Sequence, residues 1–397
     1  MITRIDSGMS LTTKNKLVYL DNAATSFPKP ESVYAAVDKV MREECGNPGR
    51  SGHKLSMSAG RVIDEARMLC ARLFHAQSPE NIVFTNNTTA ALNIAIKGTV
   101  KPGDHVITSS LEHNSVSRPL KYSEQNGVEI TKIPTDPHNG LDANSIEKAM
   151  RPNTRLVVCA HVSNVTGTVN DIVSIGAFCR GNGVLFLVDA AQSAGTRPID
   201  VQSIQADMLA FPGHKGLFGP QGTGGLYIRP GLELKTIMQG GTGSASESLS
   251  QPESMPEKFE SGTLNTPGLA GLAAGIRFIL ETGIDQIERR EAVLTNRLIE
   301  GINSMDGVNI AGPGSIQNRW NVVSIRIDKT PAADAALMMD AAFNIAVRSG
   351  LHCASDAHRS IGTLESGGTV RISPNFFNSE EDIDHCLMAL EICAEGL

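Results

Sequence analysis

The sequence predicts an α/β fold organised around a mostly parallel sheet. Residues 184–188 form an uninterrupted apolar run, which is typical of a strand buried on both faces in the middle of such a sheet. An apolar strand at 156–160 and a helical stretch with an apolar stripe at 172–179 precede it, and together they form a βαβ unit. Ligands of such sheets bind at the carboxyl ends of the strands, so functional residues are expected there.

Length and composition are those of a soluble globular protein. The 397 residues suggest roughly two to three domains of about 150 residues each, and 41% apolar residues are enough for a sizeable core. A net charge of -7 without a Lys/Arg-rich block argues against nucleic acid or an anionic membrane as partner. No apolar run approaches the roughly 20 residues of a membrane span, and residues 1–16 lack an apolar block, so a cytoplasmic protein is expected.

The cysteines predict neither a disulfide framework nor a metal site. The chain has seven of them, an odd number, and no two are spaced as C-x-x-C. Those inside predicted strands or on apolar helix stripes are expected in the core, namely Cys70, Cys159, Cys179, Cys386 and Cys393.

Short apolar runs and helical periodicity predict the elements in chain order. Strands are expected at 18–20, 82–84, 106–108, 156–160, 184–188, 208–211, 227–228, 308–310 and 322–325. Helices are expected at 62–74, 90–96, 172–179, 269–281, 284–304, 332–342 and from 378 onward. Residues 240–256 are rich in Gly, Ser and Glu and predict a long loop, and Thr266 is expected to cap the next helix with Pro267 at its first position.

An acid and a lysine follow two of these strands. Asp189 ends the central strand, where an N-cap or a salt bridge would be the ordinary explanation for a buried carboxylate. Lys215 follows the strand at 208–211 and precedes a Gly-rich turn at 219–225, so it projects from a constrained loop. Such a pair suits pyridoxal phosphate, because the amine condenses with the aldehyde and the acid keeps the ring nitrogen protonated.

A second feature of the same edge is a candidate anion site. The helix at 90–96 follows the strand at 82–84 after a polar turn. The free backbone N–H groups and the dipole of this helix N-terminus favour a bound anion. Thr88 and Thr89 lie at this point, where they either cap the helix or contact a bound anion.

These motifs carry a family resemblance. Residues 189–192 (DAAQ) and 213–215 (GHK) resemble the aspartate and lysine motifs of the class V aminotransferase-like, fold type I pyridoxal phosphate enzymes. Residues 348–354 (RSGLHCA) are similar to the cysteine desulfurase and selenocysteine lyase family, and the resemblance extends from about residue 19 to residue 382. It implies a large cofactor-binding domain at 17–262 with a seven-stranded, mostly parallel sheet. A smaller α/β domain at 263–397 would follow, with segment 1–30 packing on it.

The resemblance also implies roles for individual residues toward the cofactor. Thr88 and Thr89 would hold its phosphate, and His113 would stack on its ring. Asn164 and Gln192 would contact its phenolic oxygen, and His214 would join Asp189 and Lys215 in the binding set. Thr263 would reach across a dimer interface to the partner's cofactor phosphate, which implies a homodimer.

Other residues are assigned to the substrate. Arg371 would grip its carboxylate, because a planar guanidinium binds a carboxylate bidentately, although an arginine in a strand can also form a surface pair. Asn164 and Arg348 would also contact it. The Gly/Pro-rich stretch 46–53, which includes His53, resembles a family active-site loop but could equally be an ordinary loop.

Cys353 is the remaining cysteine with a candidate function. It lies in a polar stretch without periodicity, and cationic neighbours would help to ionise a thiol that is mostly protonated at neutral pH. Arg348, His352 and His358 are the candidates. The resemblance implies that L-cysteine, or L-selenocysteine, yields alanine while Cys353 accepts the sulfur as a persulfide. A sulfur-acceptor protein would then take it over, as in iron–sulfur cluster assembly.

Departures from the family pattern leave alternatives open. Pro212 stands where the family usually has a hydroxyl residue, Leu351 where many members have a second His, and the segment between Cys353 and Arg371 is longer than usual.

The main alternative function is that of a carbon–sulfur β-lyase or an aminotransferase on the same fold. Participation of Cys353 in the reaction distinguishes a desulfurase from these enzymes. A non-catalytic sulfur carrier is disfavoured by the intact lysine and aspartate motifs. A dinucleotide-binding dehydrogenase is excluded because the Gly-rich turn precedes a strand instead of a helix.

Overall fold

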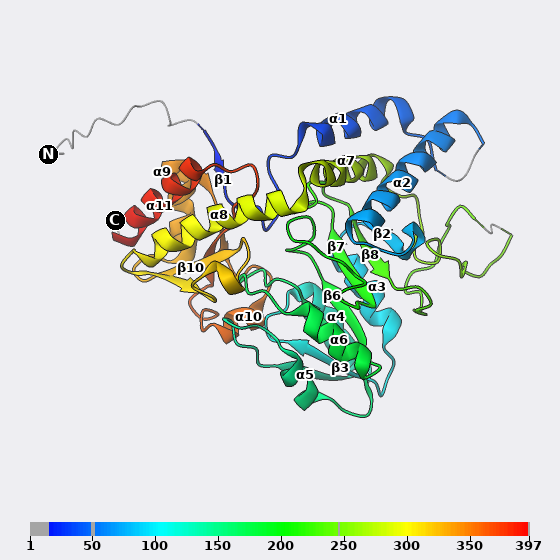
Figure 1. The fold of residues 1–397 in the computed structure, drawn as a ribbon, viewed down its shortest axis with the longest axis horizontal. Helices are drawn as coiled ribbons and strands as arrows, with labels where there is room; N and C mark the ends of the chain where they lie inside the picture. The colour runs from blue at the N-terminus through cyan, green and yellow to red at the C-terminus, as the bar shows by residue number, and fades with distance from the viewer. Residues whose placement is uncertain (1–15, 49–51, 245–246, 396–397) are drawn as a thin grey trace.

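The computed structural model describes residues 16–48, 52–244 and 247–395, and its largest element is a seven-stranded sheet (Figure 1). The strands are β2 (Ile82–Thr85), β3 (His105–Ser109), β4 (Glu129–Ile133), β5 (Thr154–Ala160), β6 (Leu185–Asp189), β7 (Met208–Pro212) and β8 (Gly224–Ile228). Their order is β2-β8-β7-β6-β5-β3-β4, and only β8 runs antiparallel to its neighbours. The prediction of a mostly parallel seven-stranded sheet is confirmed, with β6 between two parallel neighbours at its centre.

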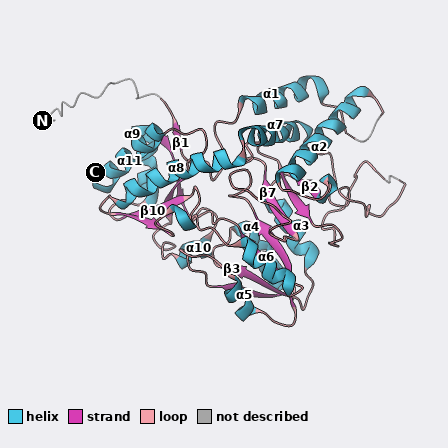
Figure 2. Cartoon of the chain, in the orientation of Figure 1, coloured by secondary structure: helices cyan, strands magenta, loops and turns pink. Residues whose placement is uncertain are grey.

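Helices cover this sheet on both faces (Figure 2). The helices of this part of the chain are α1 (Glu31–Lys39), η2 (Val40–Glu44), α2 (Lys54–Leu73), η3 (Pro79–Asn81), α3 (Thr88–Thr99), α4 (Asn114–Gln125), α5 (Ala143–Ala149), α6 (Ile172–Gly181) and α7 (Thr266–Thr282). Among them, α1 and η2 pack on α2 or α7. Alternate residues of one strand enter separate cores, so Val157 packs with side chains of α2, α6 and α7, whereas Val158 packs with those of α3 and α4. This arrangement explains why the central strands are apolar without alternation.

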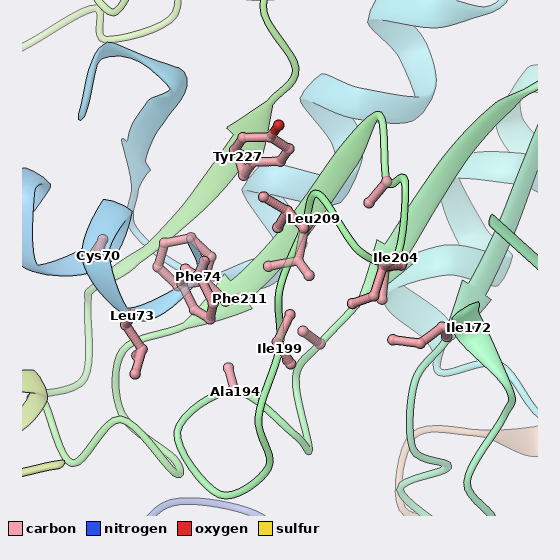
Figure 3. Close-up of a cluster of buried hydrophobic side chains, with 14 of the residues drawn as sticks. Cys70, Leu73, Phe74, Ile172, Ala194, Ile199, Ile204, Leu209, Phe211 and Tyr227 are labelled. Atoms are coloured by element: carbon pink, nitrogen blue, oxygen red, sulfur yellow. The ribbon is translucent and has the colours of Figure 1, made fainter. Parts of the chain in front are cut away.

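The first of these cores is rich in aromatic and branched side chains. Figure 3 shows Phe74, from the end of α2, against Phe211 of β7, and their ring centroids are 4.8 Å apart. Leu209, two residues earlier on the same strand, points into the same cluster. These contacts fix β7, and therefore the loop that follows it, relative to the helical layer.

A second, smaller α/β unit follows. Its four-stranded antiparallel sheet has the order β12-β13-β10-β9. The elements are α8 (Ile284–Asn303), β9 (Val308–Ala311), η4 (Ile316–Asn318), β10 (Val323–Ile327), α9 (Ala332–Phe343), β11 (Ile345–Ala346), β12 (Arg348–Gly350), α10 (Ser355–Ser360), β13 (Thr369–Ile372) and α11 (Glu380–Glu395). Figure 1 shows the long helix α8 running from the α7 side across this unit.

Chain segments far apart in sequence meet at this unit. Strand β1 (Val18–Tyr19) pairs in parallel with β11, and Asp21 forms a bridge with Ser373. Residues 1–15 of the segment expected to pack here lie outside the described residues. Helix α7 follows the predicted boundary at 262/263, yet its Leu269 and Leu272 enter the core of the large sheet. The division at that boundary therefore remains a prediction.

One predicted helix cap is wrong. Asn265, not Thr266, caps α7, because its side-chain oxygen accepts from Gly268 N at 3.0 Å and the helix already includes Thr266. The side-chain oxygen of Asn265 already satisfies the backbone N–H of Gly268, so the Thr266 hydroxyl is not needed as a cap. The sequence patterns also did not indicate α1, α4, α5 or β4.

The expected core cysteines, Cys70, Cys159, Cys179, Cys386 and Cys393, are buried. Cys45 and Cys353 are exposed. Across the described ranges, no helix is both long and apolar enough to cross a membrane.

Candidate active site

Asp189 and Lys215 meet at the carboxyl edge of the large sheet. Asp189 is the last residue of β6 and lies opposite Ala210 of β7, the strand whose following loop carries Lys215. Both residues line one cavity of about 220 Å³. The same cavity is lined by further residues selected from the sequence, namely Thr88, Thr89, His113, Asn164, Gln192 and His214.

The two ionisable groups are buried and influence each other. Asp189 accepts a hydrogen bond from Ala191 N at 2.9 Å, and burial raises the pKa of its carboxyl to about 6. Burial, together with the neighbouring positive charge of Arg371, lowers the pKa of the Lys215 amine to about 8. A neutral, basic amine on Lys215 is therefore accessible near neutral pH, beside a mostly ionised carboxylate.

The candidate anion site lies where α3 begins. Asn87 caps the helix by accepting from Ala90 N at 2.9 Å, so the cap is neither Thr88 nor Thr89. The Thr88 hydroxyl oxygen is buried and finds no hydrogen-bond partner among the described residues, whereas the Thr89 hydroxyl lies 2.7 Å from Ser115 Oγ. A buried hydroxyl without a partner at a helix N-terminus fits an anionic group such as a phosphate, which would satisfy it.

His113 is held as a neutral imidazole. Its Nδ1 accepts from Ser115 N at 3.0 Å, which places the ring proton on Nε2. Burial, together with the charge of Lys215, lowers its pKa to about 4. Ser115, which connects His113 to Thr89, was not identified from the sequence, because a serine in the first turn of a helix is ordinary.

Three further predicted residues line the cavity through polar side chains. Asn164 donates from Nδ2 to the His352 carbonyl at 2.7 Å, and its Oδ1 is buried without a partner among the described residues. Gln192 donates to the Ala23 carbonyl at 3.2 Å. The His214 ring lies 3.1 Å from Thr25 Oγ1, so the loop after β1 is fastened to this wall of the cavity.

Arg371, on β13, is buried, so the alternative of a surface pair is wrong. Its Nη2 donates to Asp21 Oδ1 at 2.9 Å, and its Nη1 donates to the Asn164 carbonyl at 3.2 Å. Nε has no partner among the described residues. The sequence did not indicate this ion pair, because the two residues are 350 positions apart.

Cys353 is exposed in the loop between β12 and α10. Arg348 Nη2 lies 3.6 Å from its sulfur. Its backbone has the left-handed φ of 58°, and its carbonyl accepts from Asn114 N at 2.8 Å. The residue after His113 thus holds the backbone of Cys353 close to the cavity that contains Lys215.

The two histidines proposed to ionise this thiol do not do so. His352 is buried with Nε2 2.9 Å from Thr369 Oγ1, and burial lowers its pKa to about 2. His358 is also buried, 2.7 Å from Thr363 Oγ1, with a pKa lowered by burial to about 4. Both rings are neutral, so of the three candidates only Arg348 places a positive charge beside Cys353.

The lining of the Lys215 cavity includes neither Arg348, Cys353 and Arg371 nor two further predicted site residues, His53 and Thr263. His53 caps α2, where its Nδ1 accepts from Ser56 N at 3.2 Å. Residues 49–51 of its loop are outside the described part of the chain. Thr263 is exposed and lines a separate cleft of about 490 Å³ between α2 and the 256–264 segment.

Comparisons with known proteins agree on one family. The aminotransferase class-V family matches residues 18–386. A probable cysteine desulfurase of Methanothermobacter thermautotrophicus is 39% identical over 92% of each chain. The cysteine desulfurase IscS of Vibrio vulnificus is 32% identical over 96% of this chain and 93% of the relative.

Solved structures give the same result. The apo structure of the cysteine desulfurase from Thermococcus onnurineus NA1 superposes with a TM-score of 0.90, at 36% identity and 96% coverage of both chains. The cysteine desulfurase CsdA from Escherichia coli superposes with a TM-score of 0.86, at 28% identity, covering 96% of this chain and 95% of that one.

Proposed function

This chain belongs to the aminotransferase class-V family of pyridoxal phosphate enzymes, and we propose that it is a cysteine desulfurase. It converts L-cysteine to L-alanine and takes the sulfur onto Cys353 as a persulfide. The observation that carries the proposal is the position of Cys353. It is exposed beside Arg348, and hydrogen bonds from Asn114 and Asn164 tie its loop to the walls of the cavity that contains Lys215.

Bound pyridoxal phosphate supplies an electron sink for the pair left when the substrate loses its α-proton. Thr88, Thr89 and the first turn of α3 would hold the phosphate, since this is where a buried hydroxyl lacks a partner. Asp189 would keep the ring nitrogen protonated, and neutral His113 would lie against the ring. Pro212 also lines the cavity and offers no donor, so the phosphate would receive one contact fewer there.

Arg371 and Lys215 would act on the substrate. Arg371 would bind the substrate carboxylate while Asp21 holds its Nη2, which keeps the guanidinium in place. The Lys215 amine would take the α-proton, because its lowered pKa leaves a neutral amine available.

Cys353 would complete the reaction. Its thiolate attacks the substrate sulfur, so a sulfur–sulfur bond forms and the carbon–sulfur bond breaks. The substrate Cβ keeps the bonding electron pair and receives a proton, which gives alanine. Arg348 stabilises the attacking thiolate. The persulfide would then pass to an acceptor protein in the cytoplasm, and L-selenocysteine would serve as a second substrate.

The test of this function is the product. With L-cysteine, pyridoxal phosphate and excess thiol reductant, the protein should release alanine and sulfide in equal amounts. Without reductant, a persulfide should be detected on Cys353 by mass spectrometry. Pyruvate and ammonia instead of alanine would point to a carbon–sulfur β-lyase, and amino transfer to a keto acid would point to an aminotransferase.

We propose further that the chain is a homodimer whose sites are completed in trans. Thr263 lies in the cleft beside α2, away from the Lys215 of its own chain. The neighbouring η2 and α2 expose a group of large apolar side chains, which are Met41, Leu55, Met57 and Met68. Covering such a patch with a second copy would bury it and bring Thr263 to the partner's cavity.

Mixed dimers test this arrangement. A Lys215→Ala subunit paired with a Thr263→Ala subunit rebuilds one intact site, because the lysine and the threonine then come from different chains. We expect the mixture, after subunit exchange, to be more active than either parent. A Lys215→Ala/Thr263→Ala double variant mixed with the wild type is the control. A monomer by light scattering, or no gain on mixing, would contradict the proposal.

Asp189→Asn should bind the cofactor but lose most activity. A neutral amide cannot stabilise a protonated ring nitrogen, and losing one charge-assisted partner costs about 1.5–3 kcal/mol, or roughly ten- to 150-fold in rate. The measurement is kcat for alanine release, with exposed Asp306→Asn as the control. Activity within about twofold of the wild type would refute the assigned role.

A further inference from the structure

Behind Lys215 lies a second cavity that the proposed reaction does not use. It has a volume of about 20 Å³. Ala191, Gln192 and Lys215 line both this cavity and the larger one, so the small cavity adjoins the candidate active site. Its other polar lining residues are Asn22, Ser26, Thr196, Glu291, Asn321 and Asn375. A polar space of this size suits a single water molecule, which needs at least about 10–15 Å³ and two to four polar partners.

Glu291 is the unusual member of this lining. It is fully buried on α8, and no cation within the described chain pairs with it. Its Oε2 accepts from Asn321 Nδ2 at 2.6 Å and its Oε1 accepts from Phe376 N at 3.2 Å. Both oxygens therefore accept bonds from neutral donors, and the side chain lines the cavity.

Burial favours the protonated form of Glu291. Burial, with a smaller contribution from Glu288 one turn earlier on α8, raises the pKa of its carboxyl to about 8. The neighbouring groups from the β10 side, the β13 side and the loop after β1 are Asn321, Asn375 and Asn22, which carry no charge. Lys215 is the charged group on the opposite wall.

We propose that Glu291 is a proton reservoir for Lys215, connected to it through one buried water in this cavity. The inference rests on the proposed desulfurase function. Conversion of cysteine to alanine returns the proton at Cα and adds one at Cβ, whereas Lys215 takes only one proton from the substrate carbon. Glu291 gives its proton to the water, and the water gives one to the amine. When the substrate sulfur loses its proton, that proton passes from Lys215 through the water to Glu291, so the carboxylate is protonated again.

The two groups at the ends of this proton path have similar pKa values. The carboxylic acid and the ammonium have nearly equal proton affinities, because burial moves both pKa values to about 8. Transfer between them is then almost isoenergetic, which is the condition for rapid proton exchange. A carboxylate at this position with its ordinary pKa could not hold a proton to deliver at neutral pH.

Glu291→Gln tests the role in catalysis. The amide keeps the size of the carboxylic acid but cannot release a proton. We expect kcat for alanine release by the holoenzyme to fall by at least about tenfold, with KM for L-cysteine unchanged and a larger solvent deuterium isotope effect on kcat. Glu300→Gln, an exposed change on the same helix, should have no effect. If wild-type holoenzyme releases alanine and Glu291→Gln has a kcat within twofold of it, the reservoir is overturned while the desulfurase function stands.

Two measurements do not depend on turnover. The infrared spectrum at pH 7, with or without cofactor, should contain the carbonyl stretch of protonated carboxylic acids from Glu291 and from Glu112, whose pKa burial also raises to about 8. Glu291→Gln should remove one of these components, and Glu300→Gln should remove none. A high-resolution structure of the wild type should show an ordered water within hydrogen-bonding distance of Glu291 and Lys215. An empty cavity in the wild-type structure overturns the proposal even if the variant fails to fold, and an unchanged infrared band in the folded variant overturns it as well.

Discussion

Lys215→Ala should release no measurable alanine from L-cysteine, a loss of at least about a thousandfold. The amine has two functions in the proposed reaction, since it joins the cofactor covalently and it moves the α-proton. Burial and the neighbouring positive charge of Arg371 lower its pKa, which suits it to both. No other lysine lines the cavity among the described residues, so none can replace it.

The variant should still bind the cofactor, because the proposed phosphate site at the start of α3 remains intact. We expect borohydride reduction followed by mass spectrometry to find the cofactor attached to residue 215 in the wild type and to no residue in the variant. Lys329→Ala, an exposed change in the small unit, is the matched control and should behave as the wild type. Attachment of cofactor to the Lys215→Ala protein would show that a different lysine is the reactive one.

Cys353→Ser should abolish alanine release from L-cysteine, by a factor comparable to that of Lys215→Ala. The serine hydroxyl does not ionise near neutral pH and cannot accept a sulfur atom, so the carbon–sulfur bond stays intact. Release from L-selenocysteine should persist at an appreciable rate, because a selenol ionises near neutral pH and leaves without attack by a thiolate. The measurement is alanine produced from both amino acids with excess reductant.

Cys45→Ser provides the control, since Cys45 is the other exposed cysteine among the described residues. It should retain full activity toward both substrates and should still form the persulfide. If Cys353→Ser keeps its activity toward L-cysteine, Cys353 is not the sulfur acceptor. The carbon–sulfur β-lyase alternative would then explain the site better.

Several features of this chain followed from the sequence because they depend on local patterns. An apolar run such as 184–188 can be satisfied only by burial on both faces, so it predicted the central strand of a parallel sheet. Asp189 ends one strand of that sheet and Lys215 lies in the loop after the next, and parallel strands bring their carboxyl ends together, so their proximity followed as well. The same reasoning placed Thr88 and Thr89 at the start of a helix beside them.

Other predictions failed because contacts between distant segments decide them. His352 and His358 are close to Cys353 in sequence, and the sequence therefore offered both as cations. The packing of this loop buries both rings, and desolvation keeps a buried imidazole neutral. The proposed dimer contact of Thr263 likewise involves a second chain, so it remains a prediction.

The sequence by itself determined the sheet, the lysine and aspartate at its edge and the family, because these depend on strand order and on short motifs. Only the tertiary structure decided which groups carry charge at the site. The Asp21–Arg371 pair, the Arg348–Cys353 contact and the buried acid Glu291 behind Lys215 join residues from different elements. Their ionisation depends on burial and on neighbouring charges, and both arise only when the chain is folded.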